Sequence, residues 1–380
     1  MYEERSRARR RGRRLALVAL VAGMLAIGFA ACSNDANSGA DDAAAAPSQV
    51  GTTADVTGAA AGGLLRVDTA SIPRVGKKRI GIVTVCAQCT GMARFLKSFQ
   101  SLAKKQGWDV TVTDTGGDAG KIVGGINTFV QARVDFLILG AIDPLTLAPQ
   151  LKAAADAGVP VAVNEGDWVP NTVFACCQDA VGMGTAQGQW ITQRLQGEGE
   201  IVMFTLPGSR SVTQRATTFK AVIGQSSGIR VVAEEQVDLA DPIGRTKAKM
   251  ASILLKHPDV KAVWAGWDDP ARGAAQAIAE SGKGSGAFVI GNDAGPDALN
   301  DIRSGSPLDG TVFIDYATEG RIFVAEIARW FDEQTVTGRT LYVQQPIVSR
   351  WLGNVPPAGK EPPAVGYYAV WPTAAEKAAG

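Results

Sequence analysis

An α/β fold made of two successive doubly wound units, each with a parallel sheet, is predicted for this chain of 380 residues. Short, continuous apolar runs rich in Val and Ile, such as RIGIVTV at 79–85, are typical of parallel strands that helices cover on both faces. Stretches with helical apolar spacing, such as 93–108, alternate with these runs. The length is sufficient for at least two domains of roughly 120 to 170 residues each.

The elements follow in a regular order. In the first unit, strands are expected at 79–85, 109–114, 134–140 and 159–164. The helices between them are expected at 93–108, at 121–131 and from Pro144, which suits a first helical turn because its missing N–H costs nothing there. The second unit repeats the pattern, with strands at 200–208, 229–236, 260–266 and 287–293 and helices at 212–223, 242–256 and 270–281.

Doubly wound folds bind ligands outside the carboxyl ends of their parallel strands. Polar or glycine-rich loops follow most of the predicted strands in this chain. We therefore expect the binding loops to follow Val85, Leu139, Val163, Phe204, Ala265 and Ile290.

Composition excludes several classes of protein. With 46% hydrophobic and 20% charged residues, the chain is not a collagen, a coiled coil or a polytopic membrane protein. His257 is the only histidine, so sites with several histidine ligands are impossible and a Ser-His-Asp triad could form only around this residue. Its position before Pro258, at a predicted helix end, indicates a structural role. No metal and no cofactor are expected.

The first 31 residues have the order of a secretory signal. Seven arginines precede the apolar run Leu15 to Ala31, which matches the basic and hydrophobic regions of a signal peptide. The run ends in Phe29-Ala30-Ala31-Cys32, which resembles a bacterial lipobox and implies cleavage before Cys32 and lipidation of its thiol. A retained signal-anchor helix is the alternative. A basic block in this position does not indicate nucleic-acid binding.

Residues 32–76 are predicted to form a flexible tether. Ala, Asp, Ser, Gly and Thr dominate up to Gly63, and such a segment cannot bury enough apolar surface to order itself. A lipidated cysteine before the tether and a globular body after it predict an exported protein, anchored to the outer face of the cytoplasmic membrane.

From about Lys77 to Val348 the chain resembles the type I periplasmic binding proteins, in particular the ribose-like, sugar-binding branch of bacterial ABC importers. The order of the elements and six segments carry the resemblance. These segments are RIGIVTV, DFLILGAIDP, GVPVAVNE, LPGSRSVTQRATTFK, LLKHPDVKAVWAGWDD and FVIGNDAGPDAL.

The resemblance implies two lobes joined by three crossovers near Cys177, Ile314 and Tyr342, with a ligand cleft between them. The N-terminal lobe would comprise 77–177 plus 315–342, and the C-terminal lobe 178–314 plus 343–352. The prolines of the extension 353–380 indicate an extended surface strap. The implied function is that of a monomeric, non-enzymatic solute-binding protein of an ABC importer. It would enclose a sugar or sugar-like polyol by hinge closure and deliver it to the membrane permease.

Three positions match ligand contacts of that family. Arg215 falls on its buried arginine, and Asp293 on the aspartate that accepts hydrogen bonds from ring hydroxyls. Glu165 stands where the family has an aspartate after the fourth strand, with Gly166 in place of the neighbouring arginine. A salt bridge at a helix end is the alternative for the first two residues, and a solvated loop acid is the alternative for Glu165.

Other positions depart from the family. Cys89 to Met92 replaces the segment Asn-Pro-Phe-Phe, and Trp267 replaces the asparagine before Asp268. The remaining expected ligand contacts are Asp268, Gln178, Trp168 and Tyr316. An aromatic ligand, or a cationic one held against indoles and acids, is therefore an alternative to a sugar. Packing within the lobes is the alternative role for the aromatic residues. A ligand-sensing partner of a receptor is another possible function.

Four cysteines remain besides Cys32. An even number in an exported protein predicts disulfides among Cys86, Cys89, Cys176 and Cys177. Neighbouring cysteines have Cα atoms about 3.8 Å apart, which strains a disulfide, so pairs between the two loops are favoured and would stiffen one wall of the site. Free buried thiols or a metal site are the alternatives. Cys86-x-x-Cys89 could also be a thiol oxidoreductase motif, which the export context disfavours.

Overall fold

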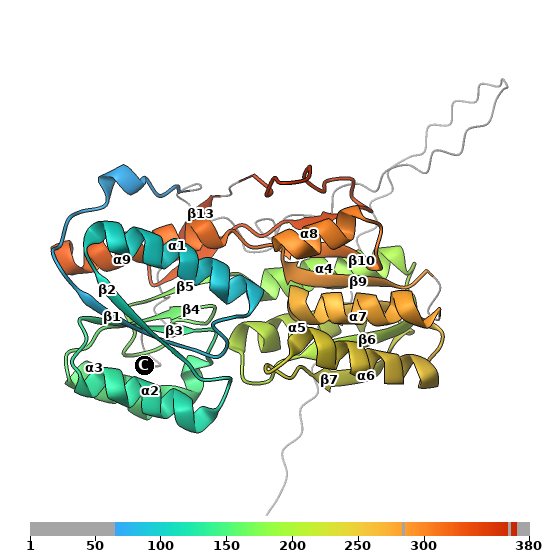
Figure 1. The fold of residues 1–380 in the computed structure, drawn as a ribbon, viewed down its shortest axis with the longest axis horizontal. Helices are drawn as coiled ribbons and strands as arrows, with labels where there is room; N and C mark the ends of the chain where they lie inside the picture. The colour runs from blue at the N-terminus through green and yellow to red at the C-terminus, as the bar shows by residue number, and fades with distance from the viewer. Residues whose placement is uncertain (1–64, 283–285, 364–365, 371–380) are drawn as a thin grey trace, which may run out of the picture. The chain divides into compact units, whose positions relative to one another are not determined.

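The computed structural model describes residues 65–282, 286–363 and 366–370, without the side chains of Cys177 and Tyr368. These residues form two sheets of seven and six strands, each covered by helices (Figure 1). The predicted signal peptide, Cys32 and the tether up to residue 64 lie outside the described residues. Within the described ranges, no helix combines the length and the hydrophobicity that a membrane crossing requires.

The first sheet has the strand order β13-β11-β5-β4-β3-β1-β2. All its neighbours pair in parallel except β13, which pairs antiparallel with β11 at the edge. The strands are β1 (Arg79–Thr84), β2 (Asp109–Asp114), β3 (Phe136–Gly140), β4 (Val161–Asn164), β5 (Phe174–Gln178), β11 (Thr340–Val343) and β13 (Tyr367–Val370). The helices of this lobe are α1 (Thr90–Gln106), α2 (Ala119–Gln131), α3 (Ala148–Asp156) and α9 (Tyr316–Glu333). Short 3-10 helices lie at Thr69–Ser71 and Pro144–Leu147.

The second sheet has the strand order β12-β10-β9-β8-β6-β7, with only β12 antiparallel. Its strands are β6 (Glu198–Thr205), β7 (Gly228–Gln236), β8 (Val260–Ala265), β9 (Phe288–Asp293), β10 (Leu308–Phe313) and β12 (Ile347–Ser349). Its helices are α4 (Ala180–Arg194), α5 (Arg210–Ile223), α6 (Pro242–Lys256), α7 (Asp268–Ser281) and α8 (Pro296–Arg303). The predicted fold class, two parallel-sheet α/β units in succession, is confirmed.

Aspartates define the starts of several helices. The side chains of Asp118, Asp179, Asp241 and Asp315 each accept a backbone N–H from the first turn of the following helix. Such caps satisfy donors that the helix itself leaves unpaired. One of them, Asp118, starts α2 at Ala119, two residues before the predicted start.

The chain passes between the sheets more often than predicted. Three passages lie between β5 and α4, between β10 and α9, and between β11 and β12. A fourth follows, because β13 returns to the first sheet after β12. The extension predicted as a surface strap thus contains a strand that pairs with β11 and, through Tyr367, with Leu65. Its aromatic and β-branched residues suit a sheet edge, and the expectation of three crossovers was one too few.

Candidate ligand-binding site

A cavity of about 50 Å³ lies between the carboxyl ends of the strands of both sheets. The first lobe lines it with residues that follow β1, β3 and β4, namely Val85, Cys86, Cys89, Gly91, Met92, Ala141 and Glu165. The second lobe lines it with Leu206, Ser209, Val212, Arg215, Leu239, Trp267 and Asp293. Tyr316, at the start of α9, completes the lining. The cavity therefore lies where the loops after the predicted strands meet.

Polar side chains meet at one end of this cavity. The Tyr316 hydroxyl donates to Asp293 Oδ1 over 2.7 Å. Arg215, 2% exposed, donates from Nη1 to Gln178 Oε1 over 3.1 Å, and its Nε has no partner among the described residues. The Ser211 hydroxyl is 3.5 Å from a carboxylate oxygen of Glu165. Donors and acceptors of both lobes are thus buried side by side.

Two of these acids lie on unusual backbone. Glu165 has φ 60° and Asp293 has φ 113°, both in the left-handed region that residues other than glycine rarely adopt. Glu165 follows β4 and Asp293 ends β9, and both strands are buried. The Asp293 carbonyl accepts a hydrogen bond of 2.8 Å from Arg94 of the other lobe. Backbone strain of this kind collects at functional sites.

Burial dominates the electrostatics of the site. It raises the pKa of Glu165, although the Arg215 charge opposes that rise. Burial also raises the pKa of Asp293 well above its ordinary value, and the charges of Asp268 and Glu165 raise it further. The same cause raises the pKa of Glu319, which lies beside Asn164, well above its usual range. Acids therefore outnumber the cations that could balance them here.

The expected ligand contacts fall into three groups. Six of them line the cavity: Arg215, Asp293, Glu165, Trp267, Cys89 and Tyr316. Asp268 and Gln178 do not line it and contact polar partners around it. Asp268 accepts hydrogen bonds of 2.7 Å from the Thr311 hydroxyl and 2.9 Å from the Gly295 N–H.

Trp168 is not part of the lining. Its indole N–H donates to the carbonyl of Thr172 over 3.0 Å, and the Arg339 guanidinium lies 5.9 Å from its ring. These contacts lie within the first lobe. They correspond to packing, the alternative role that the sequence left open for the aromatic residues.

Sequence reasoning missed most of the apolar lining. Leu206 lies in the loop that was expected after Phe204, and Val212 lies close to Arg215, but neither was named as a ligand contact. Leu239 follows β7, a strand whose carboxyl end was not among the loops considered. A more complete list of strand ends would have included Leu239. Apolar lining residues carry no other sequence signal, because core residues look the same.

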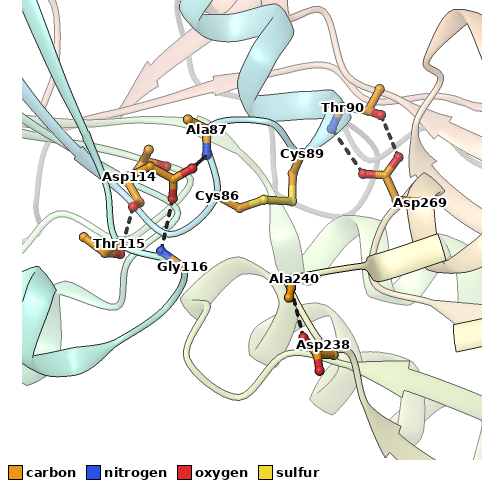
Figure 2. The surroundings of a disulfide bond; sticks show 11 residues. Cys86, Ala87, Cys89, Thr90, Asp114, Thr115, Gly116, Asp238, Ala240 and Asp269 are labelled. Atoms are coloured by element: carbon orange, nitrogen blue, oxygen red, sulfur yellow. Dashed lines mark hydrogen bonds between the residues drawn. A yellow bond between two sulfur atoms is a disulfide. The ribbon is translucent and has the colours of Figure 1, made fainter. Parts of the chain in front are cut away.

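The disulfide lies inside one loop (Figure 2). Cys86 and Cys89 are bonded to each other, with Cα atoms 5.4 Å apart, which is within the normal range. The prediction of pairs between the two loops was wrong, because the turn after β1 brings residues three apart to bonding distance. Cys176 is also disulfide-bonded. Cys89 thus faces the cavity as part of a disulfide.

Hydrogen bonds fix this loop to both lobes. Figure 2 shows the Ala87 N–H donating to Asp114 over 2.9 Å, and Thr90 donating from its N–H and its hydroxyl to Asp269. The hydroxyl bond to Asp269, at 2.6 Å, joins the first lobe to the second. The disulfide is therefore held in place beside the cavity.

A second set of contacts joins the lobes near Glu165. Asp167 accepts hydrogen bonds from Arg210 Nε over 2.7 Å and from the Gln214 amide over 3.0 Å. In the part of the chain that the structure describes, no group of His, Cys, Asp and Glu could hold a metal ion. The arrangement is suited to holding a small polar molecule by hydrogen bonds.

Comparisons with known proteins agree with this fold. The model of the periplasmic binding protein domain matches residues 80–332. The ribose import binding protein of Bacillus subtilis is 30% identical over 54% of this chain and 67% of its own length. The xylitol-binding protein of Mycolicibacterium smegmatis is 27% identical over 60% of this chain and 65% of its own. A solved structure has the same fold, with TM-score 0.67 and 24% identity over 73% of this chain and 96% of its own. It is an ABC transporter solute binding protein from Agrobacterium vitis with bound allitol.

Proposed function

The chain belongs to the periplasmic binding protein family, and on this premise we propose that it captures a sugar or an open or cyclic polyol for an ABC importer. The hydroxyls of the ligand would accept hydrogen bonds from Arg215 and Trp267 and donate hydrogen bonds to Asp293 and Glu165. The similarity to the ribose import binding protein and the xylitol-binding protein supports this class of ligand.

One observation carries the proposal: an arginine and two acids, all buried, line one cavity between two lobes. Hydrogen bonds to charged groups contribute about 1.5 to 3 kcal/mol each, and a dissociation constant near 1 μM needs about 8 kcal/mol. A few such bonds, in a site that excludes water, supply that affinity. Unpartnered donors support the same view, since the Trp267 N–H lacks a partner among the described residues.

Binding requires the lobes to move. The cavity of about 50 Å³ is small beside the 300 to 1,000 Å³ of common ligand pockets. A sugar would therefore enter between separated lobes, and hinge closure about the links after β5, β10 and β11 would bury it. The closed form is the one that a permease would recognise.

Membership of the family implies a location outside the cytoplasm. The signal sequence and Cys32 support the further proposal that the protein is a lipoprotein on the outer face of the cytoplasmic membrane. Labelling cells with a radioactive fatty acid tests this. If a Cys32→Ser variant still incorporates the label, the proposed lipidation at Cys32 is contradicted.

An aminated polyol is a second candidate ligand. Glu165 and Asp293 line the cavity with Arg215 as the only cation in the lining, so one ammonium group would balance the charge. Because ionised carboxylates are needed to hold it, the affinity for an amine should rise as pH increases toward the pKa of the amine. The affinity for a neutral polyol should not follow that course.

A thermal-shift screen of the purified full-length chain tests both candidates, with pentoses, hexoses, polyols, cyclitols and their amino derivatives. A ligand at a hundred times its dissociation constant should add about 2.7 kcal/mol of stability. An Asp293→Asn variant should then bind about 5- to 150-fold more weakly, equivalent to about 1 to 3 kcal/mol. The exposed Asp259→Asn variant is the matched control.

Two results would count against the proposed function. If no compound in the panel raises the melting temperature, the ligand is not a sugar, a polyol or an amino derivative of one. If Asp293→Asn binds a confirmed ligand as tightly as Asp259→Asn does, the site lies elsewhere.

A further inference from the structure

The cavity has a polar end and an apolar end. Tyr316 contacts Asp293, and both Asp293 and Glu165 lie within electrostatic reach of Arg215. These four side chains gather the charged and hydroxyl groups of the lining, apart from Ser209, in one cluster. The rest of the lining consists of the disulfide, a set of aliphatic side chains, Met92, Gly91, Ser209 and the Trp267 indole.

A groove of about 710 Å³ adjoins the aliphatic part of the lining. Val85, Leu206 and Leu239 line both the cavity and this groove, so they form the boundary between the two spaces. Val85 and Leu206 follow neighbouring strand ends of different lobes, β1 and β6. A molecule bound at the polar end would therefore point its far side at this apolar boundary.

Leu239 closes the boundary from the second lobe. A β-carbon placed on Gly117, in the first lobe, would lie only 3.0 Å from Leu239 Cδ1. The absence of a side chain at Gly117 thus lets Leu239 pack against the opposite lobe. A methyl-sized group of a ligand could take the same kind of position, beside the leucines and the disulfide.

We propose that the ligand is amphipathic: a polyhydroxylated body carrying one small apolar substituent, such as a methyl, O-methyl or methylthio group. The body lies on Asp293, Glu165 and Arg215, and the substituent lies against the Cys86–Cys89 disulfide, Leu206 and Leu239. This inference rests on the proposed function and specifies its ligand.

Desolvation gives the physical reason. A sugar hydroxyl placed against aliphatic side chains and a disulfide loses its hydrogen bonds to water and gains none. A methyl group in the same position gains from leaving water, by a factor of about four in affinity for each buried methylene-sized group. The site therefore discriminates by the far end of the ligand as well as by its hydroxyls.

Titration calorimetry on the full-length chain tests this with matched pairs that differ only in the substituent. The pairs are ribose with 5-methylthioribose, arabinose with its methyl glycoside, and myo-inositol with its O-methyl ethers. In at least one pair, the substituted compound should bind at least about fourfold more tightly. If every parent compound that binds does so as tightly as its derivatives or more tightly, the inference is wrong and the proposed function stands.

A variant locates the effect. Leu239→Asn puts an amide at the boundary and should remove the preference for the substituted compound, with little change in binding of the parent. Leu255→Asn, at a residue 72% exposed in the same lobe, is the control. A preference that survives in a folded Leu239→Asn protein overturns the placement of the substituent.

If Leu239→Asn does not fold, the matched pairs on the native protein decide the question alone. If no member of any pair binds, this inference is wrong, and the thermal-shift screen decides whether the proposed function falls with it.

Discussion

Gly91 offers the sharpest test of the site, because its lack of a side chain holds the polar end together. It is the second residue of α1 and lines the cavity. A β-carbon at this position would overlap the Tyr316 hydroxyl and lie 3.1 Å from Asp293 Oδ1. A Gly91→Ala variant must therefore displace the Tyr316 ring, which is only 2% exposed.

The expected cost follows from these contacts. Overpacking a buried site costs about 1 to 3 kcal/mol, and losing the 2.7 Å bond between Tyr316 and Asp293 costs a similar amount. Alanine is favoured over glycine inside a helix by about 0.5 to 1 kcal/mol, which offsets part of the loss. The net destabilisation should be about 1 to 5 kcal/mol. Affinity for the ligand should fall at least about tenfold, because one methyl group displaces both lining side chains.

Gly124→Ala is the matched control. Gly124 lies on the exposed side of α2, and a β-carbon there would have no heavy atom within 4 Å. The same substitution in a helix of the same lobe should therefore stabilise the protein by about 0.5 to 1 kcal/mol and leave binding unchanged.

Urea unfolding followed by tryptophan fluorescence measures the stability of both variants, and calorimetry measures their affinities. If Gly91→Ala is as stable as Gly124→Ala and binds the ligand equally well, Tyr316 does not occupy the cavity beside Asp293. That result would refute the arrangement of the polar end.

The remaining predictions concern charge, cross-linking and fluorescence. Burial raises the pKa of Asp268 to about 7, so the folded protein keeps a proton that the unfolded chain loses near pH 4. The free energy of unfolding should therefore fall as pH rises from about 4 to about 7. In urea titrations at several pH values, Asp268→Asn should reduce this dependence of stability on pH, and an unchanged dependence would contradict the prediction. Replacing Cys86 and Cys89 by serine should lower the free energy of unfolding by about 2 kcal/mol, since the closed loop is short. A larger loss in the same titrations would mean that the disulfide also stabilises structure outside this loop. Trp267 lines the cavity, so Trp267→Phe should remove most of the fluorescence change on ligand binding, and an equal change in the variant would assign the signal to another indole.

The fold was predictable because buried parallel strands leave a strong pattern. The run Phe136–Gly140 is buried at every position, and such runs recur with helices between them. Strand β13 was not predictable, since four residues after a proline-rich stretch carry too little pattern and their partner strand depends on long-range contacts. The antiparallel edge, and with it the fourth passage between the sheets, appears only in three dimensions.

The site was predictable where charge marks it. Arg215 and Asp293 were both assigned as ligand contacts by the family resemblance, and the structure shows them lining one cavity. The disulfide pairing was not predictable, because two loops near one another allow several pairings and only the local turn decides among them. Leu239 was missed because a leucine in a loop looks like any other partly buried residue.

The acids of the site bear on what drives closure. Glu165, Asp293 and Glu319 are buried together, and each has a raised pKa because burial disfavours its charge. Closing the lobes without a ligand must therefore either take up protons or bury charges that Arg215 alone cannot balance. A ligand that donates hydrogen bonds to these carboxylates lowers that cost. Because the ligand interacts more strongly with the closed form than with the open form, it favours closure.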